Sequence, residues 1–225
     1  MNYNIEDLEI KEILDALQYC IFNEDLDYTN DSFYDNIARI FKEHYNKPFK
    51  AFNGCSKGVL AFKELGFVIK IPFNYCDGYE LCAVQEGDNE WDYCSQEANR
   101  YKMAVEADVE EAFLPTKYLT NIDGYPIYIQ PYAEILENLS YEQYHEKESK
   151  SSKEERENIE SLNEENDFYH INSIWEVEFF KLHGFDYFMA LKNFIKKHFI
   201  RDLRAANIGY WNGKPVLIDY ASFDE

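Results

Sequence analysis

The stretch from residue 200 to residue 219 decides the fold, and it reads Ile200-Arg-Asp-Leu-Arg-Ala-Ala-Asn-Ile-Gly-Tyr-Trp-Asn-Gly-Lys-Pro-Val-Leu-Ile-Asp219. An Asn-Gly pair between two short apolar runs is the strongest local signal for a two-residue β-hairpin turn. Asp202 and Asn207 precede the hairpin, five residues apart, and Asp219 stands at its exit. The stretch therefore predicts a hairpin flanked by three polar side chains that carry oxygen atoms.

A group of short β-strands is predicted upstream. Runs of β-type residues lie at 49–52, 59–62 and 67–73, with glycine-containing turns between them at 54–58 and 64–66. In the last run, Phe67-Val-Ile-Lys-Ile-Pro-Phe73, Lys70 stands inside an otherwise apolar strand. A lysine at such a position is unusual enough to be a candidate for function.

A helix is predicted at 91–106, where apolar side chains recur at three- and four-residue steps. Glu97 lies near the inward stripe of this helix, and a carboxylate there needs a cationic partner. Residues 113–122 and 125–130 are then predicted to pair as antiparallel strands around an Asp-Gly turn.

The remaining segments are predicted to be mostly helical. Two helices are expected within the first 45 residues, and two more at 173–183 and 186–199. In the last of these, Phe199 is expected to face a core and Lys192 to lie on the solvent face. Residues 137–167 hold 11 acidic and 4 basic side chains, which indicates either an exposed charged helix or a partly disordered insertion.

Composition excludes several classes of protein. With 46% hydrophobic residues the chain is too apolar to be disordered, and its 225 residues can bury a real core. The formal net charge of −21 disfavours direct binding to nucleic acid or to an anionic membrane surface. Such acidity promotes solubility, or it serves to meet a basic partner or to mimic nucleic acid.

Cysteine spacing and the first residues indicate the compartment. The five cysteines form no Cys-x-x-Cys pair, so neither a zinc site nor a disulfide framework is predicted. The first residues lack the basic and apolar regions of a signal peptide. We therefore expect a cytoplasmic protein with reduced thiols.

Taken in order, these motifs resemble the protein-kinase-like fold, which also includes small-molecule kinases such as the aminoglycoside phosphotransferases. Val68-Ile-Lys70 resembles the third-strand lysine motif of that family, and Glu97 is placed like the glutamate of its helix C. The run from Arg201 to Asn207 is similar to its catalytic loop, and Asp219-Tyr220-Ala221 stands where the Asp-Phe-Gly motif does.

The resemblance implies an α+β, two-lobed fold with a small antiparallel sheet lobe and a reduced helical lobe, preceded by N-terminal helices. The implied domains are an N-terminal helical extension at 1–46, an N-lobe with helix C at 47–132, and a reduced C-lobe at 133–225 that contains the charged insertion 137–167 and the catalytic-loop hairpin 200–225. This is a compact form that ends soon after the Asp-Phe-Gly-like motif, so the platform for the acceptor substrate is expected to be missing or rebuilt.

The resemblance also implies a role for each site residue. The expected catalytic residues are Asp202, Lys70 and Glu97, with Mg²⁺ held by Asn207 and Asp219. The residues expected to bind ATP are Gly54, Ser56, Gly58, Lys70 and Tyr132, the last in a hinge beside the adenine ring.

Two functions follow from the resemblance. The first is an ATP- and Mg²⁺-dependent phosphotransferase that transfers the γ-phosphoryl group to an unidentified hydroxyl acceptor. The alternative is a catalytically inactive, pseudokinase-like acidic protein that binds or inhibits a macromolecular partner. The partners expected are therefore an adenine nucleotide together with a phosphate acceptor or a protein, with no direct binding of nucleic acid or membrane.

Overall fold

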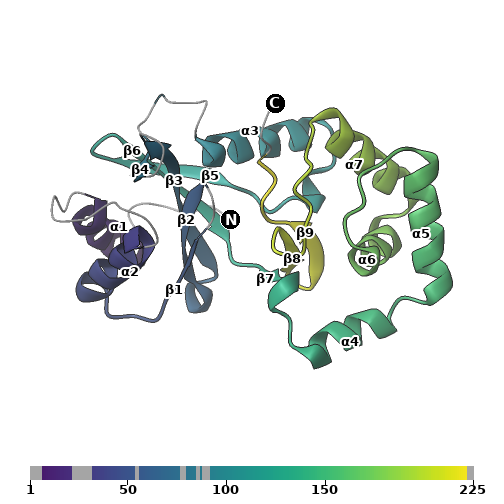
Figure 1. Cartoon of the computed structure of the whole chain (residues 1–225), viewed down its shortest axis with the longest axis horizontal. Helices are drawn as coiled ribbons and strands as arrows, with labels where there is room; N and C mark the ends of the chain where they lie inside the picture. The colour runs from purple at the N-terminus through teal and green to yellow at the C-terminus, as the bar shows by residue number, and fades with distance from the viewer. Residues whose placement is uncertain are drawn as a thin grey trace. The chain divides into compact units, whose positions relative to one another are not determined.

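The structure is a computed structural model that describes residues 7–21, 32–53, 56–76, 80–84, 87 and 92–221 (Figure 1). The predicted α+β class is confirmed. The chain divides into two compact units, of which unit 1 comprises Met1–Ala98 and Thr116–Tyr132, and unit 2 comprises Asn99–Pro115 and Ala133–Glu225. In the described ranges, no helix combines the length and the apolar character needed to cross a membrane.

Unit 1 is built on an antiparallel sheet with the strand order β1-β2-β3-β6-β5, and β4 pairs with the far end of β3. The strands are β1 (Lys50–Asn53), β2 (Lys57–Phe62), β3 (Phe67–Cys76), β4 (Glu80–Ala83), β5 (Lys117–Ile122) and β6 (Tyr125–Pro131). The predicted strands are therefore confirmed, although β5 begins four residues later than expected.

Tight turns join these strands. A 3₁₀ turn, η1 (Lys63–Leu65), leads into Gly66, whose φ of 77° is a conformation that suits glycine. Asp123 and Gly124, with φ of 48° and 96°, form the expected turn between β5 and β6. Within the turn predicted at 54–58, Lys57 and Gly58 belong to β2, and residues 54–55 lie outside the described residues.

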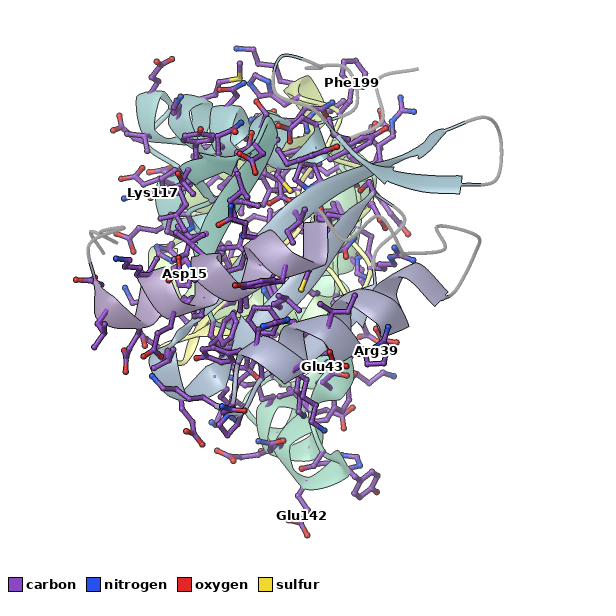
Figure 2. All side chains as sticks on the ribbon, turned by 90° about the vertical axis from the view of Figure 1, so that its left-hand side faces the viewer. Asp15, Arg39, Glu43, Lys117, Glu142 and Phe199 are labelled. Carbon is purple, nitrogen blue, oxygen red and sulfur yellow. The ribbon has the colours of Figure 1, made fainter. Side chains whose placement is uncertain are left out.

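Two N-terminal helices cover one face of this sheet. They are α1 (Leu8–Ile21) and α2 (Ser32–His44), and Figure 2 shows them lying across the strands. Asp15 and the exposed ion pair between Arg39 and Glu43, 3.1 Å long, lie on the outside. The inward side chains pack against alternate residues of the strands in one core, whose members include Ile13, Leu17, Phe41, Phe62, Ile69, Ile71, Ile127 and Ile129.

Unit 2 combines helices with a three-stranded sheet of order β7-β8-β9. Its elements are η2 (Glu110–Ala112), β7 (Glu134–Ile135), η3 (Leu136–Asn138), α4 (Tyr141–Ser149), α5 (Lys153–Glu165), α6 (Ser173–His183), α7 (Phe185–Lys197), β8 (Ile208–Trp211) and β9 (Lys214–Leu217). Asn212 and Gly213, both with positive φ, form the predicted turn between β8 and β9. The core of this unit is aromatic and includes Phe113, Trp175, Phe179, Phe188 and Tyr220.

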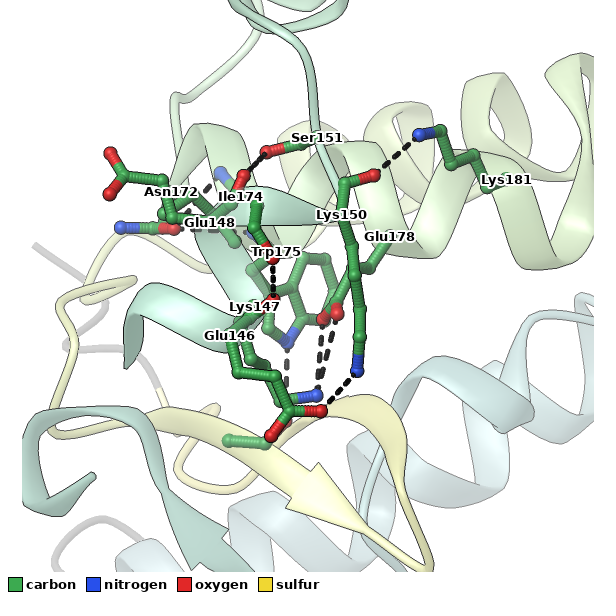
Figure 3. Close-up of polar contacts among 12 residues, drawn as sticks. Glu146, Lys147, Glu148, Lys150, Ser151, Asn172, Ile174, Trp175, Glu178 and Lys181 are labelled. Carbon is green, nitrogen blue, oxygen red and sulfur yellow. Dashed lines mark hydrogen bonds and ion pairs between the residues drawn. The ribbon is translucent and has the colours of Figure 1, made fainter. Parts of the chain in front are cut away.

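The charged tract at 137–167 forms the helices α4 and α5, each begun by a serine capping box, so the helical alternative is the correct one. Figure 3 shows how α4 is held against α6. The Nζ atom of Lys147 lies 3.4 Å from both carboxylate oxygens of Glu178 and 3.3 Å from the ring centroid of Tyr210. Lys181 Nζ donates a hydrogen bond of 2.8 Å to the backbone oxygen of Lys150.

Two expectations for α7 are wrong. Lys192 is buried rather than solvent-facing, because its ammonium group pairs with Glu176 of α6 at 2.6 Å. Phe199 is 52% exposed, since α7 ends at Lys197 and the positive φ of 51° at Phe199 takes it out of the helical path.

Candidate functional site

The face of the sheet in unit 1 that lies opposite α1 and α2 carries the polar residues of the candidate site. Side chains alternate between the two faces of a strand. Ile69 and Ile71 of β3 face the core under α1 and α2, so Lys70 points to the opposite face. By the same alternation, Gln130 of β6 and Lys57 of β2 share that face with Lys70.

Glu97 of α3 (Tyr93–Glu106) lies at the centre of a hydrogen-bonded cluster on this face. Its Oε2 accepts from Lys70 Nζ at 2.7 Å and from Thr116 Oγ1 at 2.9 Å, while Oε1 accepts from Lys57 Nζ. Gln130 Nε2 donates to Thr116 Oγ1 at 2.8 Å. Glu97 is fully buried and both lysines are nearly so, and removing one partner of such a cluster typically costs about 3–5 kcal/mol.

A second buried carboxylate lies beside this cluster. Asp92 Oδ2 accepts from the hydroxyl of Tyr128 at 2.5 Å, and Oδ1 accepts from the backbone N–H of Ser95 at 2.8 Å. Burial raises the pKa of Asp92 in spite of these hydrogen bonds. Burial also raises the pKa of the Cys94 thiol well above its usual value, so this thiol is a packing group rather than a nucleophile.

The residues expected to bind ATP in unit 1 lie in different secondary-structure elements. Gly54 lies outside the described residues, and Ser56 stands in a bend before β2. Gly58 lies within β2, opposite Ile71, and not in a loop. Tyr132 is half-buried and donates its backbone N–H to the oxygen of Gly66 at 2.8 Å.

In unit 2 the structure brings Asp202, Asn207 and Asp219 together. Asn207 Nδ2 donates to the backbone oxygen of Asp202 at 2.9 Å. The backbone oxygen of Asn207 accepts from the N–H groups of Ile218 and Asp219 at 2.8 and 3.2 Å. The five-residue step and the β8–β9 hairpin thus fix all three residues through one asparagine.

Asp202 and Asp219 differ in the contacts that hold them. The side chain of Asp202 is 43% exposed and forms an ion pair with Arg204 at 3.2 Å. Next to Asp219, the fully buried Tyr220 donates its hydroxyl to the oxygen of Leu114 at 2.7 Å, and its own backbone oxygen accepts from Arg100 at 3.2 Å. Asp219 is therefore anchored through its neighbour, while Asp202 faces solvent.

The donor set of this unit fits Mg²⁺. Asn207 and Asp219 offer an amide and a carboxylate oxygen, and Mg²⁺ is usually held by one or two such groups together with water and substrate phosphates. In the described part of the chain no three His, Cys, Asp or Glu side chains gather as a metal-binding group.

Sequence reasoning missed three members of the Glu97 cluster: Lys57, Thr116 and Gln130. The sequence places Lys57 in the turn predicted at 54–58, whereas in the structure it belongs to β2. Alternation along the strand relates Lys57 to Val59, and the register of the sheet then places both on the face that carries Lys70. Thr116 and Gln130 gave no signal of their own. Both lie near a strand end, where a polar side chain has many possible partners, so their contacts could not be predicted from the sequence.

Comparisons with known proteins give no match: no model of a protein family, no curated protein and no solved structure matches this chain.

Proposed function

We propose that the chain is a compact protein of the protein-kinase-like fold that uses ATP and Mg²⁺ to phosphorylate a hydroxyl acceptor. One observation carries the proposal. At the positions expected from the resemblance, Lys70 contacts Glu97 within unit 1, and Asn207 connects Asp202 to Asp219 within unit 2. A scatter of unrelated polar residues would not be expected to produce both sets of contacts.

Phosphoryl transfer requires little covalent chemistry from the protein and depends on positioning and charge. Lys70 would contact phosphate oxygens of ATP, and Glu97 fixes the direction of its ammonium group. The third-strand backbone on either side of Lys70 is paired with β2 and β6, which restricts the side chain further.

The residues of unit 2 would act on the metal and on the acceptor. Bound Mg²⁺ would neutralise charge on the phosphates, held by the Asn207 amide oxygen and the Asp219 carboxylate. Since Asn207 Nδ2 donates to Asp202, its Oδ1 is the atom suited to the metal. Asp202, with its side chain partly exposed, would orient the acceptor hydroxyl and accept its proton.

The first experiment is a calorimetric titration of ATP, with and without Mg²⁺. We expect metal-dependent binding that is weakened in Asp219→Asn and unchanged in the matched control Asp186→Asn, an exposed residue of α7. The absence of binding to the wild type at millimolar ATP would refute the proposal.

The second experiment measures phosphate release from ATP by Asp202→Ala. The side chain of Asp202 is paired with the exposed Arg204, so its removal should leave the fold and ATP binding intact while turnover is lost. Equal phosphate release by the wild type and the variant would remove Asp202 from the catalytic role.

The second candidate function is a binding protein without turnover, and one observation favours it. Helix α5 presents a row of exposed acidic side chains: Glu154, Glu157, Glu160, Glu164 and Glu165. Such a face suits a basic macromolecular partner. This function predicts that Lys70→Met leaves partner binding unchanged, whereas lysine substitutions along the α5 face weaken it. The opposite pattern would exclude it.

A further inference from the structure

The carboxylate of Glu97 is shared between two lysines, whereas the proposed function uses only Lys70. Lys57 comes from β2 and contacts Oε1, and Lys70 comes from β3 and contacts Oε2 at 2.7 Å. The side chains of the two lysines are 5% and 3% exposed. Two cations from different strands thus converge on one buried anion.

The register of the sheet explains this convergence. Lys70 lies opposite Val59, so Lys57 is the diagonal neighbour of Lys70, two residues along β2 and on the same face. Diagonal neighbours on one face of an antiparallel pair lie about 7–8 Å apart at their backbones, which long side chains can bridge. Both ammonium groups can therefore reach the same point above the sheet, and Glu97 marks that point.

The charges of the cluster favour an anionic ligand. The ammonium groups of Lys57 and Lys70 repel each other across the shared carboxylate of Glu97, and an anion that contacts both groups would relieve that repulsion. Among the described residues, the carboxylate of Asp92 also lies beside the cluster, and its two oxygens accept hydrogen bonds from Tyr128 and from Ser95. Cations in a buried environment are stabilised when an anion pairs with them.

We propose that Lys57 is a second phosphate-binding lysine, so that both ammonium groups contact the polyphosphate of the nucleotide while Glu97 orients them from behind. This inference rests on the proposed function and adds to it that phosphate recognition is divided between two strands. Substitution of either lysine then weakens the binding of phosphate without abolishing it, because the other lysine remains on Glu97. Loss of both removes the contact.

The test is a set of titrations with three probes: ATP, tripolyphosphate and adenosine. The proteins are the wild type, Lys57→Met, Lys70→Met, the double variant, the charge-retaining Lys57→Arg, and Lys50→Met as a control on the exposed part of β1. We expect Lys57→Met to bind ATP and tripolyphosphate at least about tenfold more weakly, since hydrogen bonds to charged groups are worth that much or more. Adenosine affinity should not change, Lys57→Arg should recover part of the loss, and the double variant should lose tripolyphosphate binding.

The other outcomes overturn the inference in distinguishable ways. If Lys57→Met binds ATP like the wild type while Lys70→Met does not, the second lysine is refuted and the proposed function stands. If adenosine and ATP affinities fall together, Lys57 serves only to hold the fold. If the wild type binds neither ATP nor tripolyphosphate, the proposed function fails and the inference with it. Thermal unfolding verifies that each variant is folded, and Lys57→Gln replaces Lys57→Met if the latter does not fold.

Discussion

Substitution of Lys192 by methionine should destabilise unit 2 by about 3 kcal/mol. Lys192 and Glu176 both have fully buried side chains, and the ammonium group lies 2.6 Å from the carboxylate. Breaking such a pair from one side typically costs about 3–5 kcal/mol, because an uncompensated charge stays buried. We expect the lower value, since Asn163 and His170 still lie 3.1 Å from the carboxylate oxygens.

The assay is thermal unfolding followed by tryptophan fluorescence, to which the fully buried Trp175 of α6 contributes. For a chain of this size, about 3 kcal/mol corresponds to a decrease in Tm of about 6–12 °C. The matched control is Lys196→Met, one turn further along α7. Its ion pair with Asp167 is exposed and should be worth less than about 1 kcal/mol.

A double variant completes the test. Glu176→Gln combined with Lys192→Met removes both charges and keeps an amide oxygen that accepts from Asn163. Replacing a buried ion pair by uncharged groups often changes stability little. The loss of stability in the double variant should therefore be at least about 2 kcal/mol smaller than the sum of the losses in the two single variants. The reasoning is refuted if Lys192→Met is no less stable than Lys196→Met, or if the single effects simply add.

Three other predictions follow from local geometry. The hydrogen bond to Glu176 raises the pKa of His170 above its unfolded value of about 6.5. The stabilisation from this contact is therefore complete below about pH 6.5 and is lost as the pH rises through the folded pKa. The difference in Tm between the wild type and His170→Gln should shrink from about pH 5.5 to about pH 8, and a constant difference would contradict this prediction. Gly209→Ala would place a Cβ atom 2.2 Å from the backbone oxygen of Glu134, so β7 must move. The free energy of unfolding should fall by about 1–3 kcal/mol in denaturant unfolding. An unchanged midpoint would show that β7 can move without loss of stability. Ser152→Ala removes the capping box of α5 and should cost about 1 kcal/mol in the same assay, and an unchanged unfolding midpoint would contradict this.

Much of the fold could be predicted because its signals are local. The Asn-Gly turn between β8 and β9 requires positive φ at two adjacent positions, and the structure has 52° and 77° there. The spacing of apolar residues at three- and four-residue steps likewise predicts the helices. In the site, an apolar strand marked Lys70, and the helical period marked Glu97 as an inward carboxylate that needs a cation.

Contacts between distant segments could not be predicted in the same way. Lys192 was expected on the solvent face because lysines are rarely buried, and its partner Glu176 is 16 residues away on another helix. The helical period does place Lys192 one turn after the buried Phe188, but only a tertiary partner makes burial of the charge favourable. The sharing of Glu97 by two lysines escaped prediction for the same reason, since Lys57 is 40 residues from that carboxylate.

The cover of the sheet by α1 and α2 has a consequence for synthesis on the ribosome. These helices are made before the strands that bury their apolar faces, and the last strand of that core, β6, contributes Ile127 and Ile129. At about 5–20 residues per second, roughly 4–17 s pass between Tyr45 and Ile129. During that interval the apolar side chains of α1 and α2, such as Phe41, remain exposed in the nascent chain. Chaperones that bind exposed apolar segments are therefore expected to bind this helical pair.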